Sequence, residues 1–522
     1  MSQPAPGPAP ASARPREHAL LAWLEEAAAR LPDKIFVHGI DQGQAISFAR
    51  MHDLVGRVGA ALRARGIGAN DRVALLSGNS LEHLIVYLGA MCHGATICTV
   101  QVEMNRSHLG EILRALDPAL TLHEDALGLA ALAASAPGEW RALGRQDRED
   151  GFFAELARTP DTPRTPLNAY HDVASIFYTS GTASKPKGVV CTYAELLENV
   201  EPTADAFGIA ERDRVLDFRS YNWMSAQVLS FLGPLLRGAT LYMARKFSQS
   251  RYFDWIRDFD ITIAACNPTA INMLVNRPIA VTAAELPHLR YITSSSAALM
   301  VADWKAFEEM YGIRIAQGCG TSETGWIAGS NERTRRLGSV GRPHAYQNLA
   351  IVDEAGNALP AGEIGAIEMG RHPDNEFRYL AEDGGYRVNS RGRARTGDLG
   401  YLDADGYLYI TGRARDLIIR GGINIAPTEI DNLVLQMPAV AEAATVGVPD
   451  AIYGEEVVVY VVPKPGASLD ETAVLAHCEA ALPHAKRPKR AIFRDALPKS
   501  ERGKMDRQAL VAEWRETHRA QA

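Results

Sequence analysis

Apolar positions recur along the N-terminal part of the chain with the period of helices. Leu20 and Leu24 fall on one face of a helix that we predict over residues 17–31. The same period predicts a second helix over residues 48–65 and a third over residues 81–93. Each such helix has an apolar face that must pack against another element.

Short apolar runs lie between and after these helical segments. We predict buried strands at residues 72–76, 95–100, 214–218, 239–243 and 261–265. Strands that alternate with helices are typical of a parallel sheet whose faces are covered by helices. The pattern therefore predicts an α/β fold with layered sheets.

The pattern changes after about residue 338, where turn signals separate short strands. We predict a β-rich subdomain there and a compact α+β unit after it. A chain of 522 residues is too long for one ordinary domain. We expect a disordered tail at residues 1–16, an N-terminal domain at residues 17–412 and a C-terminal domain at residues 413–522. The boundary lies in the charged segment 412–416.

Composition narrows the functional classes. The hydrophobic fraction of 47% and the charged fraction of 22% are those of a soluble globular protein, and the net charge of −7 argues against nucleic-acid binding. No apolar run reaches the ~20 residues that cross a membrane. The tail is rich in Pro and Ala and lacks the apolar core of a signal peptide. The six cysteines form no C-x-x-C pair, so we expect a reduced, cytoplasmic setting.

A run of small hydroxyl and glycine residues with two lysines follows the apolar residues 174–178. It reads Thr179-Ser180-Gly181-Thr182-Ala183-Ser184-Lys185-Pro186-Lys187-Gly188-Val189. Glycine lets the backbone approach an anion closely, and successive N–H groups can point inward as a nest. Hydroxyls and lysines add donors and positive charge. The run therefore predicts a phosphate-binding loop after a buried strand, although the spacing is not that of a Walker A loop.

This run resembles the signature loop of the adenylate-forming superfamily, which includes acyl-CoA synthetases, luciferases and the adenylation domains of peptide synthetases. The usual loop reads T-S-G-T-T-G-x-P-K-G-V, and this chain has Ala183 and Ser184 where Thr and Gly are common. The resemblance extends from about Asp33 to about Arg507. It implies a large N-terminal domain and a small, mobile C-terminal domain. It also implies that the phosphates of ATP are held by Thr179, Ser180, Gly181, Thr182 and Lys187, with Thr182 and Lys187 taking part in catalysis.

A second block of the family, usually Y-G-x-T-E, corresponds to Cys319-Gly320-Thr321-Ser322-Glu323. The resemblance implies that Glu323 is the Mg2+ ligand and that Gly320, Thr321 and Ser322 contact ATP. A carboxylate among hydroxyls suits Mg2+, which prefers hard oxygen ligands, whereas a single Glu in a polar loop is more often solvated surface. Cys319 stands where the family has a tyrosine that flanks adenine, and the sequence does not show what replaces it.

A third block is Arg395-Thr396-Gly397-Asp398-Leu399-Gly400. One carboxylate can accept hydrogen bonds from two sugar hydroxyls, although an Asp in a tight turn explains the tetrapeptide as well. The resemblance implies that Asp398 binds the ribose of ATP. It also implies that Arg413 joins Asp398 near the ribose and the α-phosphate, where a guanidinium offers a planar fork of donors.

The resemblance assigns two further positions near the domain boundary. Arg415 matches the hinge about which the small domain turns between adenylation and thioester formation, and Asp416 shares this role. Gly421 and Gly422 match the segment that lines the tunnel for the pantetheine arm of CoA. Two glycines also suit a simple turn.

Lys504 is our best candidate for catalysis, within the segment 498–507. In the family the matching lysine reaches the site only in the adenylating state, where a cation aligns the carboxylate with the α-phosphate and neutralises developing charge. In the implied reaction a carboxylic acid attacks ATP in the presence of Mg2+, and pyrophosphate leaves. A thiol then takes the acyl group. No Cys–His pair marks an enzyme thiol, and the chain ends eighteen residues after Lys504. We therefore expect free CoA as the acceptor.

The acid pocket is expected around three segments that are unusually polar for this family. Its candidate residues are Arg219, Asn222, Trp223, Gln227, Asn267 and Ser295. Buried polar groups need partners, so we predict a short polar or doubly anionic acid, such as a dicarboxylate or a sulfo-carboxylate. If the arginine and the serines serve the scaffold or ATP, an aromatic or a fatty acid remains open.

Two other functions remain open from the sequence. The enzyme could pass the acyl group to a separate carrier protein or an amine. The departures at Cys319 and Ala183-Ser184 are also consistent with a non-catalytic nucleotide-binding protein, which the presence of Lys504, Glu323, Asp398 and Lys187 disfavours. The oligomeric state stays open.

Overall fold

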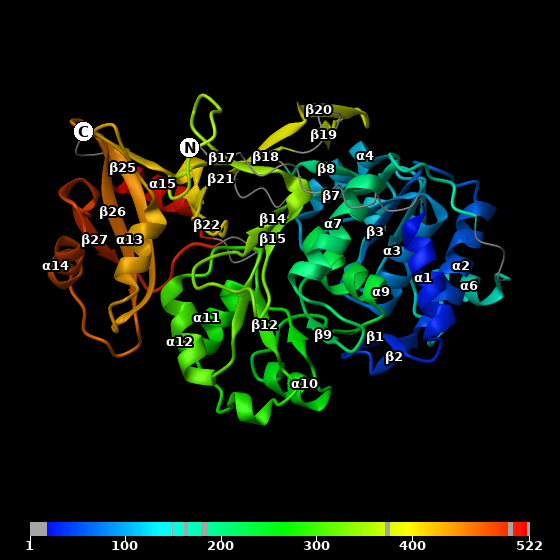
Figure 1. The fold of residues 1–522 in the computed structure, drawn as a ribbon. Helices are drawn as coiled ribbons and strands as arrows, with labels where there is room; N and C mark the ends of the chain where they lie inside the picture. Colours follow the sequence, from blue (N-terminus) through cyan, green and yellow to red (C-terminus); the bar gives the residue numbers. More distant parts are fainter. Residues whose placement is uncertain are drawn as a thin grey trace, which may run out of the picture.

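The computed structural model describes residues 18–148, 150–160, 165–178, 186–370, 376–499 and 505–518. Figure 1 shows the N-terminal helices and strands gathered on one side of the molecule and the C-terminal elements on the other. Strands of the middle of the chain lie between them. None of the described helices combines the length and the apolar character that crossing a bilayer requires.

The first large sheet has eight strands within the described residues, in the order β20-β19-β8-β7-β4-β3-β5-β6. Its strands are β3 (Arg72–Leu76), β4 (Thr96–Thr99), β5 (Leu120–His123), β6 (Glu139–Ala142), β7 (Val173–Tyr178), β8 (Gly188–Thr192), β19 (Glu376–Leu380) and β20 (Tyr386–Arg391). The strands from β7 to β6 are parallel, and the other three are antiparallel. The antiparallel strands follow the predicted phosphate-binding loop, which joins β7 to β8.

The second large sheet has seven strands, in the order β13-β12-β11-β9-β10-β1-β2. They are β1 (Ile35–Gly39), β2 (Gln44–Ser47), β9 (Arg214–Asp217), β10 (Thr240–Met243), β11 (Ile263–Ala264), β12 (Tyr291–Ser294) and β13 (Ile315–Gln317). Every neighbouring pair is parallel except β1 and β2. The predicted α/β fold with parallel sheets is thus confirmed.

Helices fill the space between the two sheets and cover them. The largest apolar core joins side chains of both sheets with α1 (Ala19–Arg30), α2 (Phe48–Ala64), α3 (Leu81–His93) and α7 (Tyr193–Ala206). Every residue of α3 is buried, which explains its nearly continuous apolar sequence. The remaining longer helices of this domain are α4 (Arg106–Leu116), α6 (Gly151–Arg158), α10 (Tyr252–Asp258), α11 (Pro268–Asn276) and α12 (Val301–Tyr311).

The predicted β-rich region is confirmed after residue 338. It contains an antiparallel sheet of β17 (Leu349–Val352), β18 (Gly365–Gly370), β21 (Arg393–Leu402) and β22 (Leu408–Arg413). A smaller sheet joins β14 (Cys319–Thr321), β15 (Gly325–Gly329) and β16 (Arg342–Pro343). Two strands from the same stretch of sequence, β19 and β20, leave this region and extend the first large sheet.

The C-terminal domain is the predicted α+β unit. Its sheet contains β23 (Ile418–Arg420), β24 (Ile423–Ile425), β25 (Val440–Asp450), β26 (Gly454–Pro463) and β27 (Arg490–Phe493), packed with α13 (Pro427–Val434), α14 (Glu471–Ala481) and α15 (Arg507–His518). This unit has apolar cores of its own. The Val301 N–H donates to Asn432 Oδ1 at 3.0 Å, a contact that links α12 to α13.

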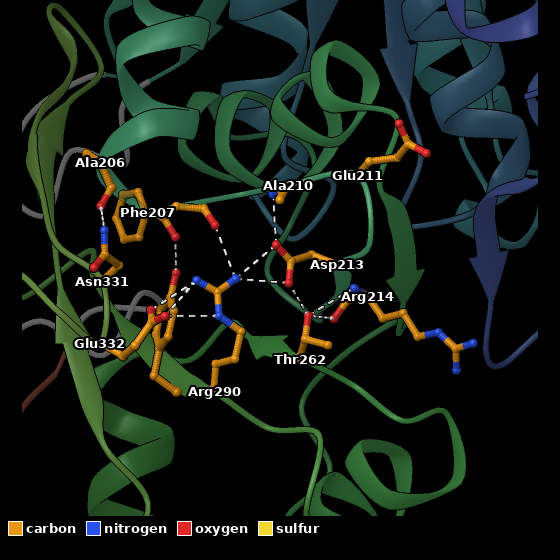
Figure 2. A network of polar contacts seen from close by, with 12 residues as sticks. Ala206, Phe207, Ala210, Glu211, Asp213, Arg214, Thr262, Arg290, Asn331 and Glu332 are labelled. Carbon is orange, nitrogen blue, oxygen red and sulfur yellow. Dashed lines mark hydrogen bonds and ion pairs between the residues drawn. The ribbon is translucent and has the colours of Figure 1, made fainter. Parts of the chain in front are cut away.

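A polar network ties together the amino ends of the second large sheet (Figure 2). Arg290, just before β12, donates to both oxygens of Asp213 at 2.9 Å and pairs with Glu332 at 2.9 Å. Asp213 also accepts from Thr262, just before β11, at 2.8 Å. The Asp213 side chain is fully buried, so this network holds three strand starts at the edge opposite to the site described next.

Candidate active site

Four predicted site segments follow four neighbouring parallel strands. Arg219 comes after β9, Asn267 after β11, Ser295 after β12, and the segment that contains Glu323 after β13. The carboxyl ends of parallel strands lie at one edge of a sheet, where α/β proteins place their ligands. The fold therefore brings the predicted acid pocket and the predicted nucleotide block to the same edge.

Arg219 is completely enclosed and already paired. Its guanidinium lies 2.7 Å from Asp217 Oδ2, and neither side chain has any exposed surface. Its Nη1 donates to Ser295 Oγ at 2.8 Å, and its Nη2 donates to Ser230 Oγ at 3.2 Å. Because each serine oxygen accepts from the arginine, each hydroxyl hydrogen is directed elsewhere. The charge of Arg219 is thus balanced by a neighbouring carboxylate.

The other predicted pocket residues mix scaffold contacts with unused oxygens. Asn222 donates to the Ser77 carbonyl at 3.0 Å, and Gln227 donates to the Tyr221 carbonyl at 2.6 Å. Their amide oxygens are buried and accept no hydrogen bond from the described residues. These contacts to carbonyls also settle the orientation of both amides.

Two features of the surrounding backbone bear on this pocket. Asn267 Oδ1 accepts from the Ala270 N–H at 2.9 Å and so caps the N-terminus of α11. Trp223 precedes the short helix α8 (Met224–Ala226), which continues into a π-helical stretch over residues 227–232. π-helical turns are rare in proteins as a whole, but those that occur are often found at functional sites.

Glu323 lies in the turn between β14 and β15, close to two residues from distant segments. The Tyr379 hydroxyl donates to Glu323 Oε1 at 2.9 Å. Lys187 Nζ lies 5.3 Å from the centre of the Tyr379 ring. Burial and the Glu323 charge raise the pKa of Tyr379. The structure thus brings Lys187 and Glu323 to one side chain, Tyr379, which sequence reasoning missed.

Two buried side-chain amides bind the backbone of the turn that carries Glu323. Asn199 on α7 accepts from the Trp326 N–H at 3.0 Å and donates to the Trp326 carbonyl at 2.9 Å. Gln347 donates to the Thr324 carbonyl at 2.8 Å. The Thr321 and Thr324 hydroxyls of the same turn lie 2.9 Å apart. Sequence reasoning missed Asn199 and Gln347 as well, because neither belongs to a motif.

Asp398 and Arg413, predicted to act together, face each other across β21 and β22. Arg413 Nε lies 2.8 Å from Asp398 Oδ1. Burial, together with the Asp398 charge, raises the pKa of the Cys319 thiol. The indole of the nearby Trp326 packs on Phe207, with ring centres 5.0 Å apart, and its Nε1 donates to the Ser225 carbonyl.

The predicted hinge and tunnel residues lie at the start of the C-terminal domain. Arg415 Nε is 3.6 Å from Asp416 Oδ1 in a single 3-10 turn between β22 and β23. Gly421 and Gly422 form the two-residue loop between β23 and β24, both with positive φ, +57° and +81°. A loop with this geometry requires residues that tolerate positive φ at both positions, which explains the glycine pair.

Several predicted residues lie outside the part of the chain that the structure describes. These are Thr179, Ser180, Gly181, Thr182 and Lys504. The described residues that border Lys504 form an antiparallel bridge between Lys499 and Met505. Two residues further on, Arg507 lies 2.6 Å from the fully buried Asp431.

The described residues offer no group of three or more His, Cys, Asp or Glu side chains that could hold a metal ion by themselves. Mg2+ in proteins is usually bound through one or two carboxylates and takes its other ligands from phosphates and water. One oxygen of Glu323, the predicted Mg2+ ligand, is held by Tyr379.

Comparison with known proteins identifies the class of the chain. Residues 24–372 match the AMP-binding enzyme family, and residues 429–504 match the C-terminal domain of AMP-binding enzymes. The chain belongs to this family, with its large N-terminal domain and its small C-terminal domain. It is an ATP-dependent, AMP-forming acid–CoA ligase.

Three similar proteins span nearly the whole chain. Sulfoacetate–CoA ligase of Cupriavidus necator is 34% identical, covering 94% of this chain and 97% of the relative. Indoleacetate–CoA ligase of Aromatoleum aromaticum is 31% identical, covering 94% of this chain and 98% of the relative. The structure of ATP-bound MatB from Rhodopseudomonas palustris has a TM-score of 0.85 at 27% identity, covering 96% of this chain and all of MatB.

Proposed function

We propose that this ligase activates a short carboxylic acid that carries a second polar or anionic group, and that free CoA accepts the acyl group. The observation that carries the proposal is the buried network of Asp217, Arg219 and Ser295 at the carboxyl edge of the second sheet. The likeness to sulfoacetate–CoA ligase supports the same substrate class.

The network provides hydrogen-bond donors rather than a free positive charge. Arg219 donates to Ser295 Oγ and Ser230 Oγ, which leaves both hydroxyl hydrogens for other acceptors. Asp217 neutralises the guanidinium, so a second anion would be held by neutral donors in a site of low dielectric. Hydrogen bonds to a charged acceptor are worth about 1.5–3 kcal/mol.

The unused amide oxygens near the pocket disfavour a purely apolar substrate. Asn222 Oδ1 and Gln227 Oε1 are buried and lack partners among the described residues. A buried acceptor left unsatisfied costs about 1–3 kcal/mol, and a long alkyl chain satisfies none. Ordered water, or a substrate group that carries an N–H or O–H, can donate to them, and a short acid leaves room for such water.

In the first half-reaction, a carboxylate oxygen of the acid attacks the α-phosphorus of ATP and the bond to pyrophosphate breaks. We assign the departing phosphates to Thr179, Ser180, Gly181, Thr182 and Lys187, with further ATP contacts from Gly320, Thr321 and Ser322. Mg2+, held by Glu323, would neutralise charge on these phosphates. Lys504 aligns the carboxylate with the α-phosphate.

Asp398 and Arg413 hold the nucleotide during this step. The Asp398 carboxylate accepts from the ribose hydroxyls, while Arg413, partly exposed beside it, contributes donors to the ribose and the α-phosphate. In the second half-reaction the CoA thiol attacks the acyl carbonyl, and AMP leaves. For this step the domain beyond residue 412 turns about Arg415 and Asp416, so that Gly421 and Gly422 line the tunnel for the pantetheine arm.

An aromatic acid is the second candidate. Trp223 lies within the predicted pocket segment, and indoleacetate–CoA ligase is a relative of nearly full length. An indole ring could stack on Trp223 and present its N–H to a buried amide oxygen. This candidate makes a different prediction for the same assay.

The test is pyrophosphate release with ATP and Mg2+ across a panel of acids, with and without CoA. The panel contains sulfoacetate, small dicarboxylates, indoleacetate, benzoates and fatty acids. We expect sulfonated or dicarboxylic acids to react best and product release to depend on CoA. Preference for indoleacetate and benzoates would establish the second candidate, and preference for long alkyl acids would refute both. Turnover that needs a carrier protein in place of CoA would refute the acceptor.

A further inference from the structure

Tyr379 occupies a position that links the two halves of the predicted ATP site. It lies on β19, opposite Val189 of β8. Val189 is two residues beyond Lys187, where the predicted phosphate-binding loop enters β8. The Tyr379 side chain reaches from this sheet to Glu323, which belongs to a turn after the other large sheet.

The hydrogen bond from Tyr379 restricts the Glu323 carboxylate. The hydroxyl donates to Oε1 at 2.9 Å, and within the described part of the chain Oε2 and the remaining lone pair of Oε1 have no other hydrogen bond. A glutamate side chain loses rotamer freedom when it is ordered, which costs free energy. A partner that orders it beforehand removes part of that cost from the binding of a ligand.

The same ring attracts Lys187. The ammonium nitrogen lies 5.3 Å from the ring centre, within the ~6 Å range of a cation–π contact. One aromatic side chain thus holds a cation against its face and an anion at its hydroxyl. Because the contacts use different parts of the side chain, a substitution can remove one and keep the other.

We propose that Tyr379 is a positioning residue for Mg2+–ATP, which holds the metal-binding carboxylate of Glu323 at its hydroxyl and the phosphate-binding ammonium of Lys187 against its ring. This inference rests on the proposed roles of Glu323 and Lys187. The test of the inference therefore measures nucleotide binding directly and includes a variant of Glu323.

The central variant is Tyr379→Phe, which keeps the ring under Lys187 and removes the hydroxyl bonded to Glu323. Binding of ATP would be titrated calorimetrically with Mg2+ and with EDTA. We expect about tenfold weaker binding in Mg2+, because the variant lacks one hydrogen bond to a charged group. Binding in EDTA should be unchanged. Tyr379→Leu removes the ring as well, so it should weaken binding under both conditions.

The matched control is Tyr386→Phe on the neighbouring strand β20. Its ring packs on Arg72 at 5.3 Å and on Arg378 at 5.8 Å. We expect this variant to bind Mg2+–ATP like the unmodified chain. Thermal unfolding of each variant identifies any loss that is due to misfolding.

A Tyr379→Phe variant that binds ATP normally in both conditions, or equally weakly in both, would overturn the inference. Glu323→Gln separates this failure from that of the proposed function. If Glu323→Gln abolishes the Mg2+ dependence and Tyr379→Phe does not alter it, only the inference fails. If Glu323→Gln leaves the Mg2+ dependence intact, the metal role of Glu323 fails, and with it the basis of the inference.

Discussion

Arg219 shows how burial changes what a charged residue can do. In the sequence it is the one cation among polar pocket residues, which suggests attraction of a second anion. In the structure Asp217 lies 2.7 Å away and both side chains are fully buried. Separating such a pair would leave an uncompensated buried charge at a cost of about 3–5 kcal/mol. In the function that we propose, Arg219 would therefore act on a ligand through the hydroxyls that it orients.

His344 is a second buried group whose charge matters. Its Nε2 is buried and has no hydrogen-bond partner among the described residues. Burial lowers the pKa of His344 to about 4. Above pH 6.5 the imidazole is neutral in the folded and in the unfolded chain, because an unfolded histidine has a pKa near 6.5. Below pH 6.5 the unfolded chain binds a proton that the folded chain binds only near pH 4.

We therefore predict that His344 makes the protein less stable in mild acid. Linkage gives a loss of about 2 kcal/mol in the free energy of unfolding between pH 7.5 and pH 5 from this side chain. His344→Phe keeps a ring beside Tyr346 and removes the titration, so urea unfolding of this variant should fall less steeply with pH. An identical pH dependence in both proteins would contradict the prediction.

At the scale of elements, the amino and carboxyl ends of the second sheet have different tasks. The carboxyl ends carry the predicted site residues. The amino ends are tied by Arg290, Asp213 and Glu332 (Figure 2). A substitution at the amino ends should accordingly affect stability and leave the chemistry unchanged.

Arg290→Met tests this division. The change leaves Asp213 buried without its cation, which should cost about 3–5 kcal/mol of unfolding free energy. The control is Arg257→Met on α10, whose partner Asp254 lies 3.0 Å away with both side chains about half exposed, and which should cost below about 1 kcal/mol. KM and kcat should stay unchanged in both variants where they are folded. Equal destabilisation of the two variants would contradict the division.

Most elements could be predicted from apolar periodicity, and the exceptions have a physical reason. The helix expected over residues 81–93 is α3, with the same bounds, because its apolar residues and its Ser80 cap are local signals. The placement of β19 and β20 could not be predicted. Their residues signal strands, but their partner β8 lies far away in the sequence, and nothing local specifies that pairing.

At the scale of the whole molecule, the family motifs could be recognised in the sequence, but their supporting residues could not. Asp398 and Arg413 were predicted to act together, and the structure pairs them across two strands. Tyr379, Asn199 and Gln347 contact the Glu323 turn from distant segments. Such residues become visible only when the chain is folded, because their role depends on proximity and not on spacing.

The substrate class, too, could be predicted only in part from the sequence, because it depends on contacts that form in the folded chain. The polarity of the pocket segments is readable from the sequence, whereas the pairing of Arg219 with Asp217 is not. The pairing replaces a free charge by oriented hydroxyls. The resulting expectation is discrimination by hydrogen bonding, which can reject an analogue that lacks the polar group far more strongly than an apolar pocket rejects an extra methylene.

The most direct test compares two acids of nearly equal shape. Sulfoacetate carries a sulfonate where 3,3-dimethylbutanoate carries a tert-butyl group, so the pair isolates the second polar group. We predict that kcat/KM for CoA-dependent pyrophosphate release favours sulfoacetate by about tenfold or more. Equal or higher kcat/KM with 3,3-dimethylbutanoate would contradict the proposal that the ligase acts on an acid with a second polar group.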